Sequence, residues 1–250
     1  MSPDRQPAIR PVRFSYDDGH STGAHAHEEH QLVYASRGVL SVETAGSRWV
    51  LPAQRAAWIP AQTSHTVFAE STAEMAALYI EAVGPTVRGG LSVFEVSPLL
   101  RHLVLHLLED DATDDGARAR LERVVLDQLA AAPLAPTGLR RLADPRLQAI
   151  ADLLRADPRD NRTLKDFGAV VGASERTLQR LFVAETGTTF GRWRTQLRLQ
   201  EGLIWLGRGE SVTVAATRAG YDQPSAFIAA FRTTFGTTPG RFVRGIQAQP

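Results

Sequence analysis

Short apolar runs alternate with turn residues between Val12 and about Ser97. The runs recur roughly every 8–12 residues and are separated by turn dipeptides such as Arg37-Gly38 and Ile59-Pro60. This spacing predicts an antiparallel sheet folded as a sandwich or barrel. The predicted strands are Leu32–Ala35, Val39–Thr44, Trp49–Leu51, Ala57–Ile59, Thr66–Ala69, Ala76–Ile80 and Leu91–Val96.

After residue 97 the apolar positions recur at intervals of three and four, which is the period of a helix. Two such stripes, separated by a polar break at Asp111–Gly116, predict a helical hairpin over residues 97–131. We expect the second stripe to form a homodimer interface, with packing against the sheet of the same chain as the alternative. The stripes are Leu99, Leu100, Leu103, Val104, Leu107 and Leu108, then Leu121, Val124, Val125 and Leu129.

A Pro- and Ala-rich segment at 131–137 indicates a linker, placed at 132–143, and the pattern from Asp144 onward is helical throughout. The chain is therefore expected to be α+β with two domains. We assign residues 1–96 to the β domain, 97–131 to the hairpin and 144–250 to an all-α domain. The predicted helices are Leu147–Leu154, Leu164–Val171, Ser174–Glu185, Phe190–Leu206, Val212–Ala219, Ser225–Phe235 and Arg241–Val243.

The helical domain repeats one arrangement about 48 residues apart, at Leu164–Phe182 and Val212–Phe231. Each copy has a short helix, a glycine (Gly172 or Gly220), a polar position and an amphipathic helix ending in Phe. This layout is typical of a helix-turn-helix, whose second helix enters the major groove of DNA.

The second helix of the first copy carries polar side chains on its outer side. Arg pairs with guanine and Gln with adenine through bidentate hydrogen bonds, so this face is suited to reading bases. The candidate DNA-binding residues of this copy are Ser174, Arg176, Thr177, Gln179 and Arg180.

The stretch from about Leu164 to Phe242 resembles the DNA-binding domain of the arabinose-regulator (AraC/XylS) family. The resemblance implies a bacterial transcription regulator, activator or repressor, that binds promoter DNA. It also implies two helix-turn-helix units in successive major grooves, joined by the helix Phe190–Leu206. RNA polymerase is an expected partner if the protein is an activator. The matching residues include Ser174, Leu178, Arg180, Phe182, Gly187, Arg198, Ala215, Gly220, Tyr221, Phe227, Phe231, Phe235, Gly236, Pro239 and Phe242.

The second helix-turn-helix copy departs from better-known family members. Its recognition helix leaves only Gln223 and Ser225 as polar candidates for contact with DNA. We therefore expect this copy to make mostly phosphate and apolar contacts. The residues responsible for the departure are Pro224, Ala226, Ile228 and Ala229.

Histidines cluster in the predicted β domain. His25 and His27 are two residues apart, so in an extended strand they point to one side, and His65 follows the turn at Pro60. The spacing of Gly19, His25, His27, Gln31 and Gly38, followed by Pro60, Ala61 and His65, resembles the two metal motifs of the cupin barrel.

The cupin fold is one that the arabinose-regulator family often carries as its sensor, and cupins usually have Glu where this chain has Gln31. Three neutral imidazoles from His25, His27 and His65 suit Zn, Ni, Fe or Cu, while the missing carboxylate disfavours harder ions. The alternatives are an organic effector that contacts His25, His27, Gln31 and His65, and a structural role for the histidines.

Composition narrows the class of protein. The chain has no Cys, no apolar run long enough to span a membrane, and an N-terminus without the apolar core of a secretory signal. We therefore expect it in the cytoplasm. Residues 1–140 carry 12 Arg against 17 Asp or Glu, a net −5, whereas residues 141–250 carry 16 basic against 10 acidic residues, a net +6. This asymmetry supports a polyanion partner at the C-terminal end.

These observations favour a regulator whose cupin domain senses a small effector or a metal ion and controls the two DNA-binding units. A metal-dependent cupin oxygenase or isomerase with an accessory helical domain is the rival interpretation. The two helix-turn-helix copies and the absent carboxylate at Gln31 disfavour it, so no enzymatic activity is expected.

Overall fold

The computed structural model describes residues 8–82, 87–109, 114–135, 138–140 and 142–247. The chain forms two compact units, Met1–Thr44 with Leu51–Thr137, and Ala45–Val50 with Gly138–Pro250. The predicted linker at 132–143 contains the short strand β9 (Leu139–Arg140), and residues 136, 137 and 141 lie outside the described residues.

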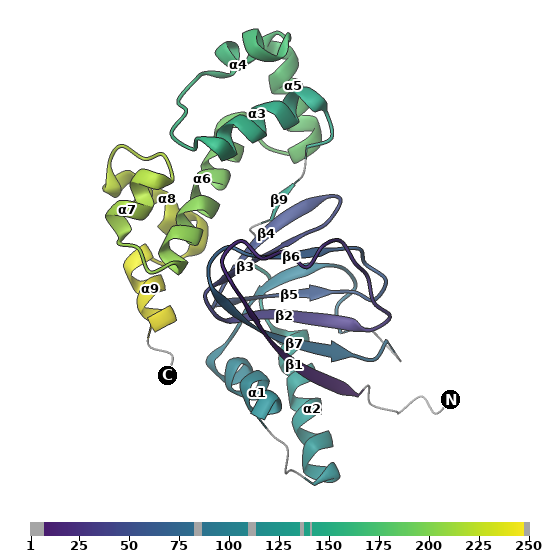
Figure 1. The fold of residues 1–250 in the computed structure, drawn as a ribbon. Coiled ribbons are helices and arrows are strands. Elements are labelled where there is room, and N and C mark those ends of the chain that lie inside the picture. Colours follow the sequence, from purple (N-terminus) through teal and green to yellow (C-terminus); the bar gives the residue numbers. More distant parts are fainter. Residues whose placement is uncertain (1–7, 83–86, 110–113, 136–137, 141, 248–250) are drawn as a thin grey trace. The chain divides into compact units, whose positions relative to one another are not determined.

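A five-stranded antiparallel sheet forms the larger part of the N-terminal unit (Figure 1). The strand β2 is central and almost continuously buried, as expected of a strand covered on both faces. In the order of the sheet, its strands are β1 (Ile9–Tyr16), β7 (Ala73–Ile80), β2 (His30–Arg37), β5 (Arg55–Ile59) and β8 (Ser92–Glu95).

A second pair of antiparallel strands in this unit is formed by β3 (Val39–Glu43) and β6 (Thr66–Ala69). Gly38, just before β3, has φ +72°, and a Cβ there would collide with the carbonyl oxygen of Thr72. Only glycine fits this approach without strain.

The sequence predicted seven of these strands, including β4 (Ser47–Pro52), but not β1. The strand β1 lies at the edge of its sheet, where charged residues and proline are tolerated. Its sequence contains Arg10, Pro11 and Arg13, which obscure the alternation of apolar and polar positions.

The helices α1 (Pro98–Glu109) and α2 (Asp115–Ala131) confirm the predicted hairpin. They pack against the five-stranded sheet, because Leu100, Leu107 and Leu129 share one core with Trp58 and Leu78. The polar break between them, at 110–113, lies outside the described residues.

The predicted dimer interface on α2 is wrong in its residues. Val125 and Leu129 are fully buried within the chain, Leu121 is partly buried against the same core, and Val124 is 41% exposed. The core of the same chain therefore covers Val125 and Leu129 and leaves Val124 outside it. A homodimer itself stays a prediction.

The C-terminal unit is helical, and all seven predicted helices are confirmed (Figure 1). Three helices end at glycines with left-handed backbone, Gly172, Gly187 and Gly236. A short antiparallel pairing of β4 with β9 also belongs to this unit. The helices are α3 (Pro145–Ala156), α4 (Leu164–Val171), α5 (Glu175–Thr186), α6 (Phe190–Gly207), α7 (Val212–Arg218), α8 (Pro224–Phe235) and α9 (Pro239–Gln247).

Among the described residues, every helix is too short or too polar to cross a membrane.

Val125→Glu is expected to unfold the N-terminal unit rather than to yield a folded monomer. Burying an unpaired carboxylate in an apolar core costs more than about 3 kcal/mol, a large part of a domain's stability. Val124→Glu is the matched control, since its side chain is exposed and its cost is expected within about 0.5 kcal/mol. Thermal unfolding followed by circular dichroism compares the two, and equal melting temperatures would contradict the packing described here.

Candidate functional sites

The three candidate histidines of the N-terminal unit converge. His25 and His65 lie opposite each other in an isolated antiparallel bridge, with each backbone N–H donating to the other's carbonyl at 3.0 and 2.9 Å. The ring of His27 lies 5.2 Å from that of His65, between centroids. One ring nitrogen from each residue falls within 4.8 Å of the others. His25 lies in this bridge and His27 in irregular chain, so the convergence does not depend on the extended strand in which two residues point to one side.

Backbone carbonyls set the tautomer of each ring. A carbonyl oxygen only accepts hydrogen bonds, so the Nδ1 facing it must carry the proton and Nε2 is left with a free lone pair. The contacts are Gly23 O to His25 Nδ1 at 3.0 Å, Glu29 O to His27 Nδ1 at 2.7 Å, and Thr63 O to His65 Nδ1 at 2.8 Å.

Gln31 completes the cluster from β2. Its Oε1 lies 3.1 Å from Nε2 of His27 and 3.1 Å from Nε2 of His65, and its side chain is buried. A carbonyl oxygen and two lone pairs do not attract one another. Two arrangements that satisfy these atoms are the amide NH₂ turned to donate to both rings, and a cation held between the oxygen and the nitrogens.

Burial is the main cause that lowers the pKa of His65 to about 4. The hydrogen bond to the Thr63 carbonyl opposes this shift, and the neighbouring His25 and His27 add to it. The imidazole is thus neutral at physiological pH. Neutral imidazole is the form that binds transition metals.

The turn after β5 positions two sides of the cluster. Gln62 has φ +62°, a left-handed conformation that costs a non-glycine residue energy. Its backbone N–H donates to the carbonyl of His27 at 2.8 Å, and the next residue, Thr63, supplies the carbonyl that orients His65. The ring of His30 points elsewhere, stacking on Trp58 at 5.0 Å.

Tyr79 borders the site, and no chemical motif in the sequence identifies it. It pairs with Gln31 in the register of β2 and β7, and its ring centroid lies 5.3 Å from that of His27. The guanidinium of Arg10 lies over the Tyr79 ring at 4.3 Å and pairs with Glu29 at 2.8 Å. The register of Tyr79 against Gln31 was the signal that could have identified it.

The first helix-turn-helix consists of α4, the turn at Gly172 and α5. The Ser174 hydroxyl accepts from the backbone N–H of Thr177 at 3.1 Å and so begins α5. Leu178 and Phe182 bury the inner face of α5. Thr177 is half-buried, and the other four predicted DNA-binding residues of this copy are exposed, namely Ser174, Arg176, Gln179 and Arg180.

The second helix-turn-helix consists of α7, the turn at Gly220 and α8. Phe227 and Phe231 bury the inner face of α8. Gln223 and Ser225 are exposed, as predicted. Two residues further along the recognition helices are also exposed, Val183 on α5 and Arg232 on α8. They were not among the predicted DNA-binding residues, which lie mainly in the first turns.

A half-buried arginine joins the two helix-turn-helix copies. From α6, Arg198 donates to Pro158 O at 2.8 Å, Asp160 O at 3.1 Å and Asn161 Oδ1 at 2.8 Å, all in the loop before α4. Gly220 of the second turn has φ +82°, and a Cβ there would collide with the same carbonyl oxygen of Pro158. The turn of the second copy thus packs directly against the loop that begins the first.

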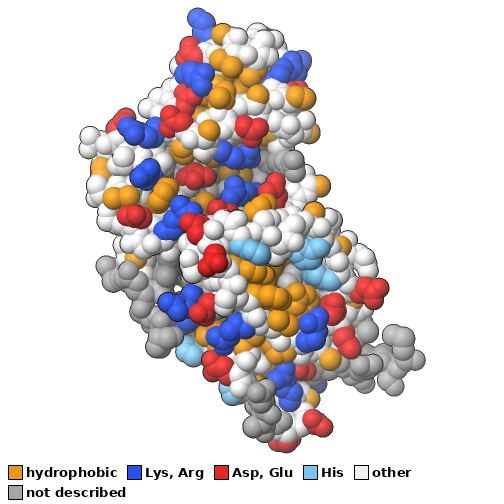
Figure 2. Space-filling view, viewed as in Figure 1, with side chains coloured by type: hydrophobic (Ala, Val, Ile, Leu, Met, Phe, Trp, Pro, Cys, Tyr) orange, Lys and Arg blue, Asp and Glu red, His pale blue; other side chains and the backbone are white. Residues whose placement is uncertain are grey.

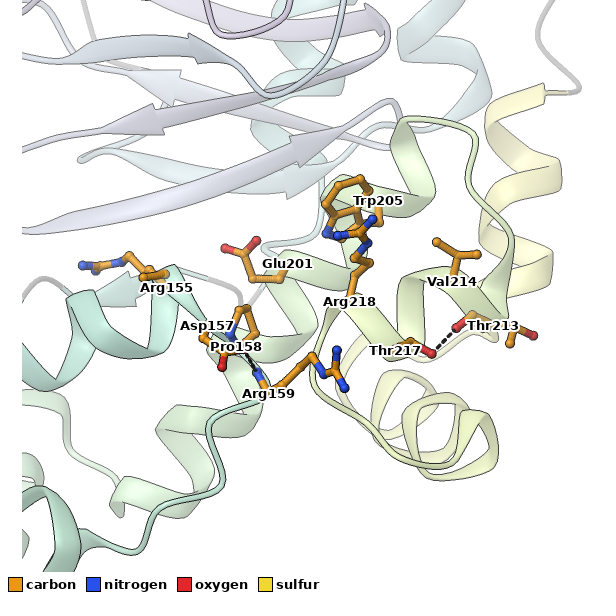
Figure 3. Close-up of a pocket in the computed structure, with 11 residues that line it drawn as sticks. Arg155, Asp157, Pro158, Arg159, Glu201, Trp205, Thr213, Val214, Thr217 and Arg218 are labelled. Atoms are coloured by element: carbon orange, nitrogen blue, oxygen red, sulfur yellow. Dashed lines mark hydrogen bonds between the residues drawn. The ribbon is translucent and has the colours of Figure 1, made fainter.

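A cleft of about 790 Å³ lies in the C-terminal unit between the end of α3, α6 and α7 (Figure 3). Arg218 reaches across it, with its guanidinium 4.9 Å from the ring of Trp205. Both signs of charge line the cleft, from Arg155, Asp157, Arg159, Glu201 and Arg218. On α5 the exposed charged residues are Glu175, Arg176 and Arg180. On the N-terminal unit, His side chains reach the surface beside hydrophobic ones (Figure 2).

Together, a β unit with a polar cluster and a helical unit with two helix-turn-helix copies define a DNA-binding regulator with a separate ligand-binding domain. Comparisons with known proteins agree. Residues 11–156 match the family described as "AraC-like ligand binding domain", and residues 167–245 match "Helix-turn-helix domain". The chain belongs to the AraC family of transcription regulators.

The relatives of this chain include proteins described as transcriptional regulators. The "HTH-type transcriptional regulator NimR" of Escherichia coli K12 is 32% identical over 88% of this chain and 81% of its own length. The "HTH-type transcriptional regulator RipA" of Corynebacterium glutamicum is 35% identical over 41% of this chain and 31% of its own. The crystal structure of ToxT from Vibrio cholerae aligns with 94% of this chain and 96% of its own at 10% identity, with a TM-score of 0.41.

Gly220→Ala is expected to destabilise the C-terminal unit by more than about 2 kcal/mol, since the new Cβ adds a collision with Pro158 to the strain of a positive φ. Gly236→Ala is the control, because Gly236 has φ +70° but no atom within 4 Å of the added Cβ, so only the strain of about 1 kcal/mol applies. Thermal unfolding of both variants measures the difference. Equal losses would mean that the two turns do not pack as described.

Proposed function

We propose that the N-terminal domain is a cupin-type sensor in which His25, His27 and His65 hold a transition-metal ion. In this proposal, occupancy of the site controls how two helix-turn-helix units bind adjacent major grooves of promoter DNA. A regulator of this class needs a ligand that favours one of its states over another, and the metal ion is that ligand.

The observation that carries this proposal is the convergence of one ring nitrogen from each of the three histidines, each of which also has its Nδ1 at a backbone carbonyl. Metal-binding histidines are oriented in this way, because a hydrogen bond from the other ring nitrogen fixes the ring and raises its basicity. The donors lie within 4.8 Å of one another. Metal–nitrogen bonds of about 2.0–2.1 Å need donors roughly 3.4 Å apart, so side-chain rotations bring them together on binding.

The donor set selects the type of metal. Three imidazoles suit Zn, Ni, Cu or Fe, whereas Mg, Ca and Mn prefer oxygen ligands. Gln31 offers a neutral oxygen beside two of the nitrogens, 3.1 Å from each. A neutral oxygen adds less attraction for a hard cation than the carboxylate that cupins usually have there. In this proposal the protein senses the ion and does not use it for catalysis, because the site lacks a carboxylate ligand.

The DNA-binding part of the proposal rests on the two outer faces of α5 and α8. The α6 helix that joins them has 18 residues and is about 27 Å long, close to the length of one turn of DNA. Each unit then faces a separate stretch of major groove. On α5, Arg180 pairs with guanine and Gln179 with adenine.

His25→Ala is expected to remove most of the metal bound by the purified full-length protein. Its affinity for Zn²⁺ should fall about 10- to 100-fold. The His20→Ala variant is the matched control, because His20 is exposed and stacks on Tyr16 at 4.5 Å, outside the cluster. Elemental analysis and calorimetric titration with Zn²⁺, Ni²⁺ and Cu²⁺ measure the effect.

In the same series, Gln31→Glu should shift preference toward Fe²⁺ and Mn²⁺, because it restores a charged oxygen ligand. Wild-type protein that binds none of these ions, and whose DNA binding is unchanged by His25→Ala, would contradict the metal proposal. An organic effector would then be the better explanation of the cluster.

Arg180→Ala is expected to weaken binding to a selected duplex by about 1–3 kcal/mol and to relax base preference at one position. Arg176→Ala tests the neighbouring arginine one turn earlier on the same face. Equal losses on selected and random duplexes, measured by fluorescence anisotropy, would show that Arg180 contacts only phosphate.

A further inference from the structure

The two recognition helices of the C-terminal unit correspond position by position. A shift of 49 residues takes Leu178 and Phe182, the buried residues of α5, to Phe227 and Phe231, the buried residues of α8. The same shift takes Arg180 to Ala229. The two helices therefore present equivalent outer faces with different chemistry.

Ala229 lies at the centre of the outer face of α8. At about 100° per residue it is roughly 200° from Phe227 and also from Phe231, so it points directly away from the buried side. Its neighbours on this face are small or apolar at the start of the helix and polar at the end. The exposed residues of α8 are Ser225, Ala226, Ala229, Arg232 and Thr233.

The methyl groups of Ala226 and Ala229 cannot form hydrogen bonds, which restricts what they can recognise. In the major groove the only apolar group on a base is the C5-methyl of thymine, and alanine contacts it favourably. A small side chain at the centre of the face also lets the helix approach the bases closely. Arg232, two turns after Ser225, is placed for the backbone phosphates, where it adds affinity without sequence preference.

We propose that the second helix-turn-helix selects thymines through Ala226 and Ala229, while the first selects guanine and adenine through Arg180 and Gln179. The inference rests on the proposed function of α5 and α8 as DNA-reading helices. The DNA site of this protein then consists of two subsites. The first helix-turn-helix recognises one subsite through hydrogen bonds to the bases, and the second recognises the other subsite through contacts with thymine methyl groups.

The first experiment selects duplexes from a random pool with full-length wild-type protein and with Ala229→Arg. Arginine pairs with guanine, so the variant is expected to select guanine at one position where the wild type selects thymine. The substitution is at an exposed position and introduces a good helix former, and thermal unfolding checks that the fold is kept. The base pair at which the two proteins select different bases identifies the second subsite. A selection identical to that of the wild type at every position would overturn the proposal.

The second experiment replaces that thymine with deoxyuridine, which lacks the methyl group and keeps every hydrogen-bonding atom. Binding of the wild type is expected to weaken about fourfold, the effect of leaving one methyl group in water. Ala229→Gly, which removes the protein's methyl group, should lower this ratio of thymine to deoxyuridine affinity toward one. An unchanged affinity of the wild type for the deoxyuridine duplex would overturn the proposal.

The two experiments separate this inference from the proposed function. Failure of the wild type to enrich any sequence from the pool would contradict specific DNA reading itself. Enriched duplexes that lose affinity with Arg180→Ala but tolerate deoxyuridine would leave the proposed function intact and contradict only thymine readout by α8.

Discussion

The DNA-binding unit depends on the guanidinium of Arg198. It lies half-buried and donates to two backbone carbonyls and one side-chain oxygen in the loop from Pro158 to Asn161. Burial lowers its pKa, yet an arginine stays charged at any physiological pH, so these are charge-assisted hydrogen bonds. Arg194 adds a fourth contact, to the carbonyl of Arg162 at 2.9 Å. Together they fix the start of the first helix-turn-helix to the long helix α6, and Gly220 lets the second one pack against the same loop.

The sensor unit is organised by a different constraint, the need to satisfy every buried polar group. The imidazole rings of His25, His27 and His65 satisfy backbone carbonyls with Nδ1. The Nε2 atoms of His27 and His65 then lie beside the buried amide of Gln31. The same hydrogen bonds that stabilise the loops therefore orient the rings as the proposed metal site requires.

The sequence predicted what is encoded locally. The helices of the C-terminal unit were found because polar N-cap residues and glycines bound them, and the three histidines because their spacing is a motif. Features set by tertiary contacts were not found. The edge strand β1 lacks a regular alternation of apolar and polar residues. Val125 is buried and Val124 exposed because of what packs against α2. Tyr79 reaches the histidines because of the register between β2 and β7.

The exposed Val183 and Arg232 were not predicted for a related reason. Which residues of the later turns point outward can be told only once the buried face of the helix is known. With that reference, the recognition helices differ in chemistry at matching positions. The proposed division of base recognition between α5 and α8 requires that the two helices keep a fixed separation. The contacts of Arg198 and Gly220 supply this fixed separation.

The most direct test of this rigid pairing is the affinity of wild-type protein for a selected duplex with 5 base pairs inserted between the two subsites. Such an insertion turns one subsite by about half a helical turn relative to the other. Affinity is expected to fall to that of a duplex with one subsite destroyed. Unchanged affinity would contradict the account, because it would mean that the two helix-turn-helix units move independently.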